Sequence, residues 1–184
     1  MTPSQAGALM ATRKTSGFLF VAILSALMAF TSLSTDIYLP AMPIMAKELQ
    51  GNVELTITGF LIGFCLAQLI WGPLSDHFGR RLPLFIGMAL FIIGSAGCAL
   101  STTLTQIVFW RVFQALGACT GPMLARAMIR DLYSRTRAAQ MLSTLMVIMA
   151  IAPIIGPLLG GQMIKVASWV AIFWLLAVIG LLML

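Results

Sequence analysis

The chain has 184 residues, of which 60% are hydrophobic and 9% are charged. A typical soluble domain has roughly 25% charged residues, a disordered chain has few apolar residues, and a secreted disulfide scaffold is small and rich in cysteine. The composition excludes these classes and predicts an integral membrane protein. At about 20 residues for each span, the length accommodates about six transmembrane helices with short connections.

The charged residues divide the chain into long, uniformly apolar segments, whereas barrel strands are short and alternate. We therefore predict an all-α membrane protein, with residues 17–184 forming a six-helix transmembrane bundle and residues 1–16 a cytoplasmic tail. The first apolar run is too long for the core of a signal peptide, so we expect it to be retained. The predicted helices are Gly17–Tyr38, Leu55–Leu74, Leu82–Leu100, Leu104–Ala125, Ala138–Met163 and Val166–Leu184.

Basic residues are unevenly distributed between the two ends of the predicted helices. With a cytoplasmic N-terminus, the inner segments hold eight basic residues and the outer segments hold two. Cytoplasmic loops of membrane proteins are enriched in Lys and Arg. The net charge of +6 is therefore interpreted as an orientation signal, and no nucleic-acid partner is expected. The inner eight are Arg13, Lys14, Arg80, Arg81, Arg126, Arg130, Arg135 and Arg137, and the outer two are Lys47 and Lys165.

Two charged residues lie within the apolar segments. Arg111 is about seven residues, or roughly 10 Å, into the fourth predicted helix, and Asp36 lies in the outer part of the first. Charges at this depth are costly unless they face protein or water, so both are candidates for function. The alternatives are a structural ion pair, or an aspartate that reaches the outer interface. Desolvation favours a neutral carboxyl group and a nearby cation favours its ionised form, so Asp36 could bind and release a proton.

Residues 72–81 read Gly-Pro-Leu-Ser-Asp-His-Phe-Gly-Arg-Arg and predict a tight inner turn. Gly79 permits unusual backbone angles, and Asp76 can favour the start of a helix. The segment resembles the signature loop of the major facilitator superfamily, although His77 stands where arginine is commoner. The resemblance implies charge contacts that gate the inner side. The gating residues would be Gly72, Asp76, Gly79, Arg80 and Arg81.

Two further segments agree with this resemblance. Residues 111–117 resemble a fourth-helix motif whose arginine is associated with proton coupling, and Arg111 and Gln114 share a helix face because they are three residues apart. Residues 150–161 resemble the fifth-helix antiporter motif, in which glycines four apart form a flat strip and prolines bend the helix. Generic small-residue packing is the alternative. The antiporter residues would be Pro153, Gly156, Pro157, Gly160 and Gly161.

Residues 35–43 and 130–133 are similar to the Bcr/CflA group of drug-resistance transporters within this superfamily. That resemblance implies that Asp36 carries the coupling proton or contacts a cationic substrate. Tyr38 could contact substrate, or it could lie at the membrane interface. Family members have twelve helices, and each six-helix half is a 3+3 inverted repeat. The chain matches the N-terminal half, so a C-terminal half is expected, and the repeat suggests that Asp36 and Arg111 approach each other.

The resemblance implies a secondary active transporter of a bacterial inner membrane that exports drugs or small solutes by proton antiport with alternating access. The expected partners are a hydrophobic or cationic drug, protons and the lipid bilayer, with no cofactor and no metal. An enzyme is disfavoured because no reactive constellation is found, and a channel because no polar stripe could line a pore. A half-length relative acting only as an assembly partner remains an alternative, and sodium coupling also stays open.

Overall fold

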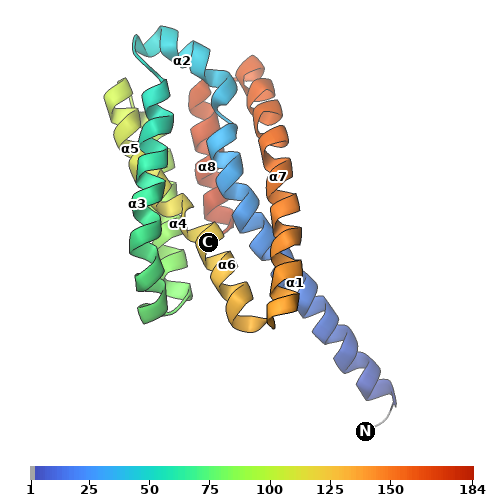
Figure 1. The fold of residues 1–184 in the computed structure, drawn as a ribbon. Coiled ribbons are helices and arrows are strands. Elements are labelled where there is room, and N and C mark those ends of the chain that lie inside the picture. The colour runs from blue at the N-terminus through green and yellow to red at the C-terminus, as the bar shows by residue number, and fades with distance from the viewer. Residues whose placement is uncertain (1–2) are drawn as a thin grey trace.

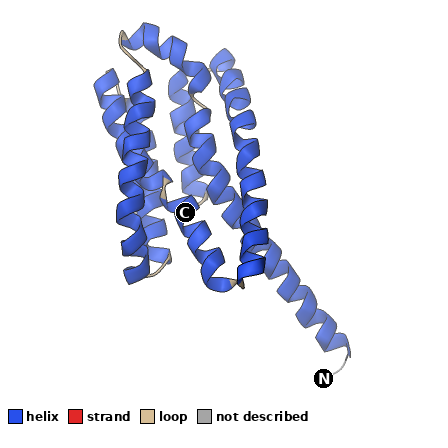
Figure 2. Cartoon of the chain, viewed as in Figure 1, coloured by secondary structure: helices blue, strands red, loops and turns tan. Residues whose placement is uncertain are grey.

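The computed structural model describes the backbone of residues 3–184 and the side chains from Phe20 onward. The regular structure in this range is helical (Figure 2), and most of the helices run side by side along a common direction (Figure 1). The elements are α1 (Pro3–Asp36), the short 3-10 helix η1 (Leu39–Ala41), α2 (Met42–Leu49), α3 (Glu54–Phe78), α4 (Arg81–Leu100), α5 (Leu104–Ala118), α6 (Thr120–Leu132), α7 (Arg135–Val166) and α8 (Trp169–Leu182).

The length and composition of these helices confirm the predicted membrane fold. Five helical stretches are long and apolar enough to cross a bilayer, whereas the sixth apolar helix, α8, has 14 residues. The chain is a multi-pass membrane protein. The five long stretches are Phe20–Leu49, Glu54–Phe78, Arg81–Leu100, Leu104–Leu132 and Arg135–Val166.

The first and fourth predicted helices differ from the observed ones because of proline. Helix α1 begins at Pro3 rather than Gly17 and ends at Asp36, and η1, with Pro40 in its first turn, then begins at Leu39. The fourth helix is interrupted at Cys119, since Pro122 has no N–H to donate to the Ala118 carbonyl, and α6 then continues to Leu132. The cytoplasmic tail of residues 1–16 stays a prediction, and the side chains of Arg13 and Lys14 lie outside the described residues.

The helices pack in pairs that fit two related three-helix units. Helix α3 lies along α5, and α7 lies along α1, while α4 packs against both α5 and α8. Glycines permit both of the first two contacts: a Cβ on Gly63 would lie 3.0 Å from the Val112 carbonyl oxygen, and one on Gly156 would lie 3.0 Å from the Asp36 Cβ. Small residues allow such close approach in membranes. The second helix therefore contacts the fourth as the fifth contacts the first, as an inverted repeat requires.

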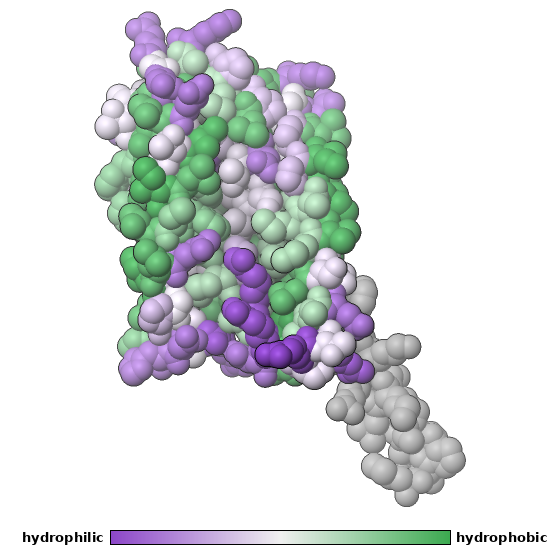
Figure 3. Space-filling model, viewed as in Figure 1, coloured by the Kyte–Doolittle hydropathy of each residue, from purple (hydrophilic) through white to green (hydrophobic). Residues whose placement is uncertain are grey.

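The surface shows where the bundle meets lipid and water. Figure 3 shows hydrophobic side chains along both flanks and hydrophilic ones at the two ends of the molecule, with further polar side chains over α6 in the lower middle. Large apolar residues such as Leu69, Ile154 and Leu158 are exposed on the flanking helices. In a bilayer these exposed side chains contact acyl chains, so their exposure fits a transmembrane bundle.

Candidate functional site

Arg111 is the most deeply buried charged residue in the described part of the chain. Its side chain has no exposed surface, although it projects from the second turn of α5 into the centre of the bundle. Its Nη1 donates hydrogen bonds to Gln114 Oε1 at 2.6 Å and to the Ser34 carbonyl oxygen at 3.5 Å. The shared helix face predicted for Arg111 and Gln114 is thereby confirmed.

Aromatic rings from three other segments surround the guanidinium group. The Arg111 Cζ lies 3.8 Å from the ring centroid of Tyr38, 4.9 Å from that of Phe60 and 5.6 Å from that of Phe173. The negative faces of aromatic rings stabilise a cation at these distances, more so when water is excluded. Tyr38 is fully buried and its hydroxyl lies 3.4 Å from that of Thr56, so its side chain packs inside the bundle.

The cation lacks an ionic partner among residues 20–184. Nε and Nη2 of Arg111 have no hydrogen-bond acceptor there, and no carboxylate lies within ion-pair distance. The expectation that Asp36 approaches Arg111 is wrong for this conformation, since Arg111 contacts the backbone carbonyl of Ser34 and the ring of Tyr38 instead. Asp36 is two residues from each and therefore points to another side, where it lies beside Gly156 of α7.

A chain of hydrogen bonds fixes the orientation of Gln114, the hydrogen-bond partner of Arg111. Gln114 Nε2 donates to the Ser95 hydroxyl at 2.7 Å, and this hydroxyl donates to the Phe91 carbonyl oxygen at 2.8 Å. With its amide nitrogen held by α4, Gln114 presents its oxygen to Arg111. Sequence reasoning missed Ser95 as well as Phe60 and Phe173, because none of them lies in a motif and each reaches the site only through helix packing.

The segment that resembles the antiporter motif forms the surface of α7 that meets the end of α1. A Cβ on Gly160 would overlap the Ile37 carbonyl oxygen, whereas one on Gly161 would meet no atom within 4 Å. Gly156 and Gly160 thus form the predicted flat strip, and Gly161 faces open space. Pro153 and Pro157 lie inside α7, which continues past both to Val166. The glycine strip of α7 therefore packs directly against Asp36 and Ile37 at the end of α1.

Charge contacts tie together neighbouring ends of three helices, α3, α4 and α6. Arg80 Nη1 lies 2.7 Å from Asp76 Oδ1, and its Nε and Nη2 donate to Asp131 Oδ2 on α6 at 3.2 and 3.0 Å. Desolvation opposes the charged form of Arg80, but hydrogen bonds with both carboxylates outweigh it and raise the pKa of Arg80 above its ordinary value. Asp131 was missed as a partner because it lies 51 residues away in sequence.

The predicted turn geometry is partly confirmed. Gly79 has a φ of 80°, a conformation that favours glycine. The helix-start role predicted for Asp76 is wrong, because α3 continues to Phe78 and Asp76 lies in its last turn. Asp76 instead reaches Arg80 from four residues away. Arg81 begins α4 with an exposed side chain, and a Cβ on Gly72 would meet open space.

Replacing Asp131 with asparagine should loosen the C-terminal end of α6 without unfolding the bundle. The Asp131–Arg80 contact joins two helices, but exposed ion pairs contribute only about 0–1 kcal/mol to stability. We expect faster amide hydrogen exchange over residues 126–133 and little change in the unfolding midpoint. Asp76→Asn is the matched control, since its contact with Arg80 does not involve α6. Equal exchange in the two variants would show that Asp131 does not restrain α6.

A polar hollow lies beside this charge cluster. It has a volume of about 340 Å³ and is lined by α3, α6 and α7, with Gln68, Arg126 and Arg130 as its polar residues. A neighbouring hollow of about 390 Å³ includes Asp76 and Asp131. The polar side chains over α6 in Figure 3 gather in this part of the molecule. The hollow therefore gives one end of the bundle a hydrophilic recess between apolar flanks.

These features define a polytopic α-helical membrane protein built from two related three-helix units around a buried arginine. The chain belongs to the Major Facilitator Superfamily, whose family model matches residues 8–184. It is 41% identical over 156 residues to the uncharacterized MFS-type transporter YdgK of Bacillus subtilis, covering 82% of this chain and 39% of that protein.

Two other relatives carry resistance in their names. The chain is 31% identical over 173 residues to a bicyclomycin resistance protein homolog of Haemophilus influenzae, covering 91% of this chain and 43% of that protein. It is 31% identical over 156 residues to multidrug resistance protein D of Escherichia coli, covering 83% and 40% respectively. These identities confirm the predicted resemblance to drug-resistance members of the superfamily. The chain spans about two fifths of the length of the curated relatives it matches.

Proposed function

We propose that the chain is the N-terminal half of a secondary transporter that exports hydrophobic or cationic drugs, or other small solutes, in exchange for protons. The observation that carries this proposal is the buried Arg111 of α5, which has unpaired N–H groups, while the carboxylate of Asp36 lies at the end of the neighbouring helix α1. Charged residues at membrane depth are expensive and are kept for ion or substrate pathways. The relatives named for drug resistance support the substrate class.

The coupling step that we propose is an exchange of partners at the end of α1. In the described conformation Arg111 contacts Ser34 and Tyr38, while Asp36 lies against α7. A displacement of α1 relative to α5 would bring an ionised Asp36 toward the unpaired N–H groups of Arg111. Protonation of Asp36 would remove this attraction and favour the present arrangement. Proton binding would thereby bias the two conformations of an alternating-access cycle.

In the complete protein, a C-terminal six-helix half would close the polar hollow between α3 and α7, so that substrate could bind between the halves. We propose a bacterial inner membrane, with the cytoplasmic N-terminus and residues 1–16 on the inner side, because eight of the eleven basic residues then lie inside. The gating role of the Asp76–Arg80–Asp131 cluster would be to hold the inner ends of α3, α4 and α6 together until substrate binds.

Replacement of Asp36 with asparagine in the full-length protein should abolish substrate-driven proton movement. The amide keeps the size and polarity of the carboxyl group but cannot release a proton. The measurement is drug-dependent alkalinisation or acidification of the lumen of proteoliposomes under an imposed pH gradient. Asp36→Glu, which keeps the titrating group, is the matched control.

Three outcomes would contradict the proposal. Undiminished proton-coupled export by the Asp36→Asn protein would remove the coupling role of Asp36. Export that requires a sodium gradient would replace the proton with sodium. Wild-type protein that folds with its second half but moves none of the drugs tested would favour the role of an assembly partner.

A further inference from the structure

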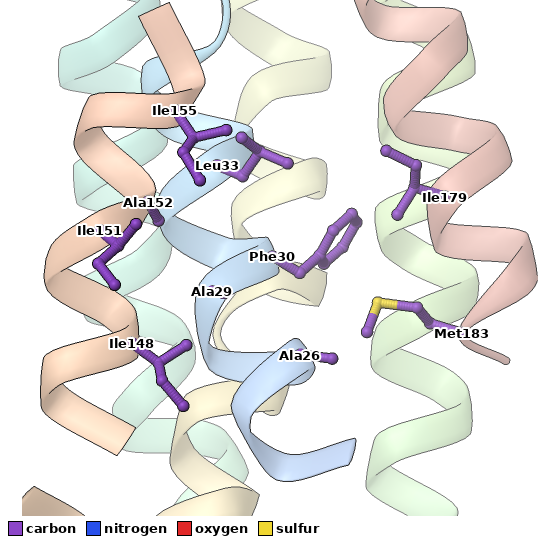
Figure 4. A pocket seen from close by; sticks show the side chains of 10 residues that line it. All are labelled: Ala26, Ala29, Phe30, Leu33, Ile148, Ile151, Ala152, Ile155, Ile179 and Met183. Atoms are coloured by element: carbon purple, nitrogen blue, oxygen red, sulfur yellow. The ribbon is translucent and has the colours of Figure 1, made fainter. Parts of the chain in front are cut away.

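An apolar cavity of about 320 Å³ lies between α1, α7 and α8. Figure 4 shows side chains from the three helices converging on it, among them Ala26, Phe30, Ile148, Ile155 and Met183. All of the lining residues are apolar, and Ala26, Ile151 and Ile155 are exposed at its rim. An apolar space of this size does not hold ordered water, but in a bilayer it is open to hydrocarbon.

The cavity interrupts the symmetry of the bundle. In the inverted repeat, α1 and α8 correspond to α5 and α4, which pack so closely that a Cβ on Gly94 would lie 2.5 Å from the Gln114 backbone nitrogen. The turn after α1 meets α8 at the Tyr38–Phe173 pair, but the cavity separates α1 from α8 around Ala26 and Ala29. The contact between α4 and α5 is closely packed, whereas small side chains leave an open space at the corresponding contact between α1 and α8.

The position of the cavity excludes the expected second half as its occupant. That half would cover the polar hollow, which α7 borders through Leu142. Leu142 is six residues from Ile148, which places it about 120° around the helix from the cavity. The cavity therefore opens toward the surrounding bilayer rather than toward the hollow.

A basic residue, Arg137, lies on the same face of α7 as the cavity, toward the start of the helix. Arg137 is eleven residues before Ile148, which is about three helical turns, so the two side chains share a face and lie about 16 Å apart along the axis. The cavity residues Ile148–Ile155 then lie near the bilayer midplane when Arg137 is at the headgroups, because half of a bilayer is about 20–22 Å thick. Arg137 is exposed and forms no ion pair with the side chains of residues 20–184.

We propose that this face is a binding site for one anionic phospholipid. Arg137 binds the phosphate, and the distal part of an acyl chain occupies the cavity between α1 and α8. The spacing from charge to cavity matches the length of a lipid from phosphate to chain end, and the lining matches hydrocarbon. Basic sites between transmembrane helices are known to recognise anionic headgroups in this way. The lipid would act as a filler that holds α8 beside α1, and the site does not depend on what the protein transports.

The test is native mass spectrometry of the full-length protein titrated with phosphatidylglycerol or with phosphatidylcholine of the same chain length. We expect the wild-type protein to bind a first phosphatidylglycerol in preference to phosphatidylcholine. Arg137→Gln should weaken that binding about fivefold, the contribution of one basic residue at the membrane surface, and leave phosphatidylcholine unchanged. Ala29→Phe, which fills the cavity, should weaken the binding of both lipids.

Arg135→Gln is the matched control, because Arg135 lies on another face of α7 and should leave lipid binding unchanged. Equal losses for Arg135→Gln and Arg137→Gln would reveal only diffuse surface charge and would overturn the proposal. So would equal affinity for the two lipids, or unaltered binding by Ala29→Phe. If Ala29→Phe alters the circular dichroism spectrum, the smaller Ala26→Leu at the rim takes its place. Displacement of the lipid by a hydrophobic drug at stoichiometric concentration would instead make the cavity a substrate site.

Discussion

Gly160→Ala is expected to destabilise the protein by roughly 1–3 kcal/mol, the usual cost of overpacking a well-packed contact. The added Cβ would overlap the carbonyl oxygen of Ile37, which belongs to the backbone at the end of α1 and cannot rotate away. Helix α7 would have to move away from α1 and lose much of their shared contact. The measurement is the free energy of unfolding of the full-length protein in mixed detergent micelles.

Gly161→Ala is the matched control for that substitution. The neighbouring position faces open space, so the new methyl group meets no atom, and the better helix propensity of alanine should be neutral or stabilising by up to about 1 kcal/mol. Equal effects of the two substitutions would contradict the close approach of α7 to Ile37. Loss of transport by Gly161→Ala without loss of stability would instead indicate that this glycine faces a part of the complete protein that moves.

Replacing Arg111 with methionine is expected to abolish coupled export while leaving stability unchanged or higher. A buried cation without an ionic partner costs desolvation energy, and exchange of buried ionic groups for apolar ones of similar volume is often neutral or stabilising by about 1–4 kcal/mol. Methionine also packs well against Tyr38 and Phe60. If Arg111 serves proton coupling, as we propose, substrate-driven proton movement should be lost in the same variant.

Two comparisons separate this role from a structural one. Arg111→Lys keeps the charge but loses the planar group that stacks on the aromatic rings, so coupling should be impaired although the cation remains. Arg135→Met removes an exposed arginine at the start of α7 and should change neither property. An Arg111→Met protein that unfolds several kcal/mol more readily would show that the aromatic cluster requires the cation. Retention of coupled export would remove Arg111 from the proposed mechanism.

Much of the fold follows from patterns within single helices. Apolar run lengths and the charges between them located the helices, and the three-residue spacing of Arg111 and Gln114 predicted the shared helix face on which they form a hydrogen bond. The interruption at Cys119 also has a local cause, because Pro122 removes a hydrogen-bond donor from the fourth helix. Because a proline inside a helix breaks its hydrogen-bond pattern, Pro122 predicts two helical segments here instead of one.

The remainder of the site depends on packing that no local pattern encodes. Phe60 and Phe173 reach Arg111 from α3 and α8, and Ser95 of α4 holds its partner Gln114. Asp131 reaches Arg80 across 51 residues. The side to which Asp36 points could have been worked out from its spacing to Tyr38, but only once Tyr38 was known to face α5. An intramembrane charge can therefore be identified from sequence as functional before its partner can be named.

The short segment from Ser34 to Tyr38, at the end of α1, connects the contacts of two other helices. Ser34 and Tyr38 contact Arg111 on one side, and Asp36 and Ile37 lie against the glycine strip of α7 on the other. These residues span five positions, little more than one helical turn, so a displacement that changes their contact with α7 also changes their contact with Arg111. If Asp36 binds the coupling proton, as we propose, displacement of this segment would carry the effect of protonation to Arg111.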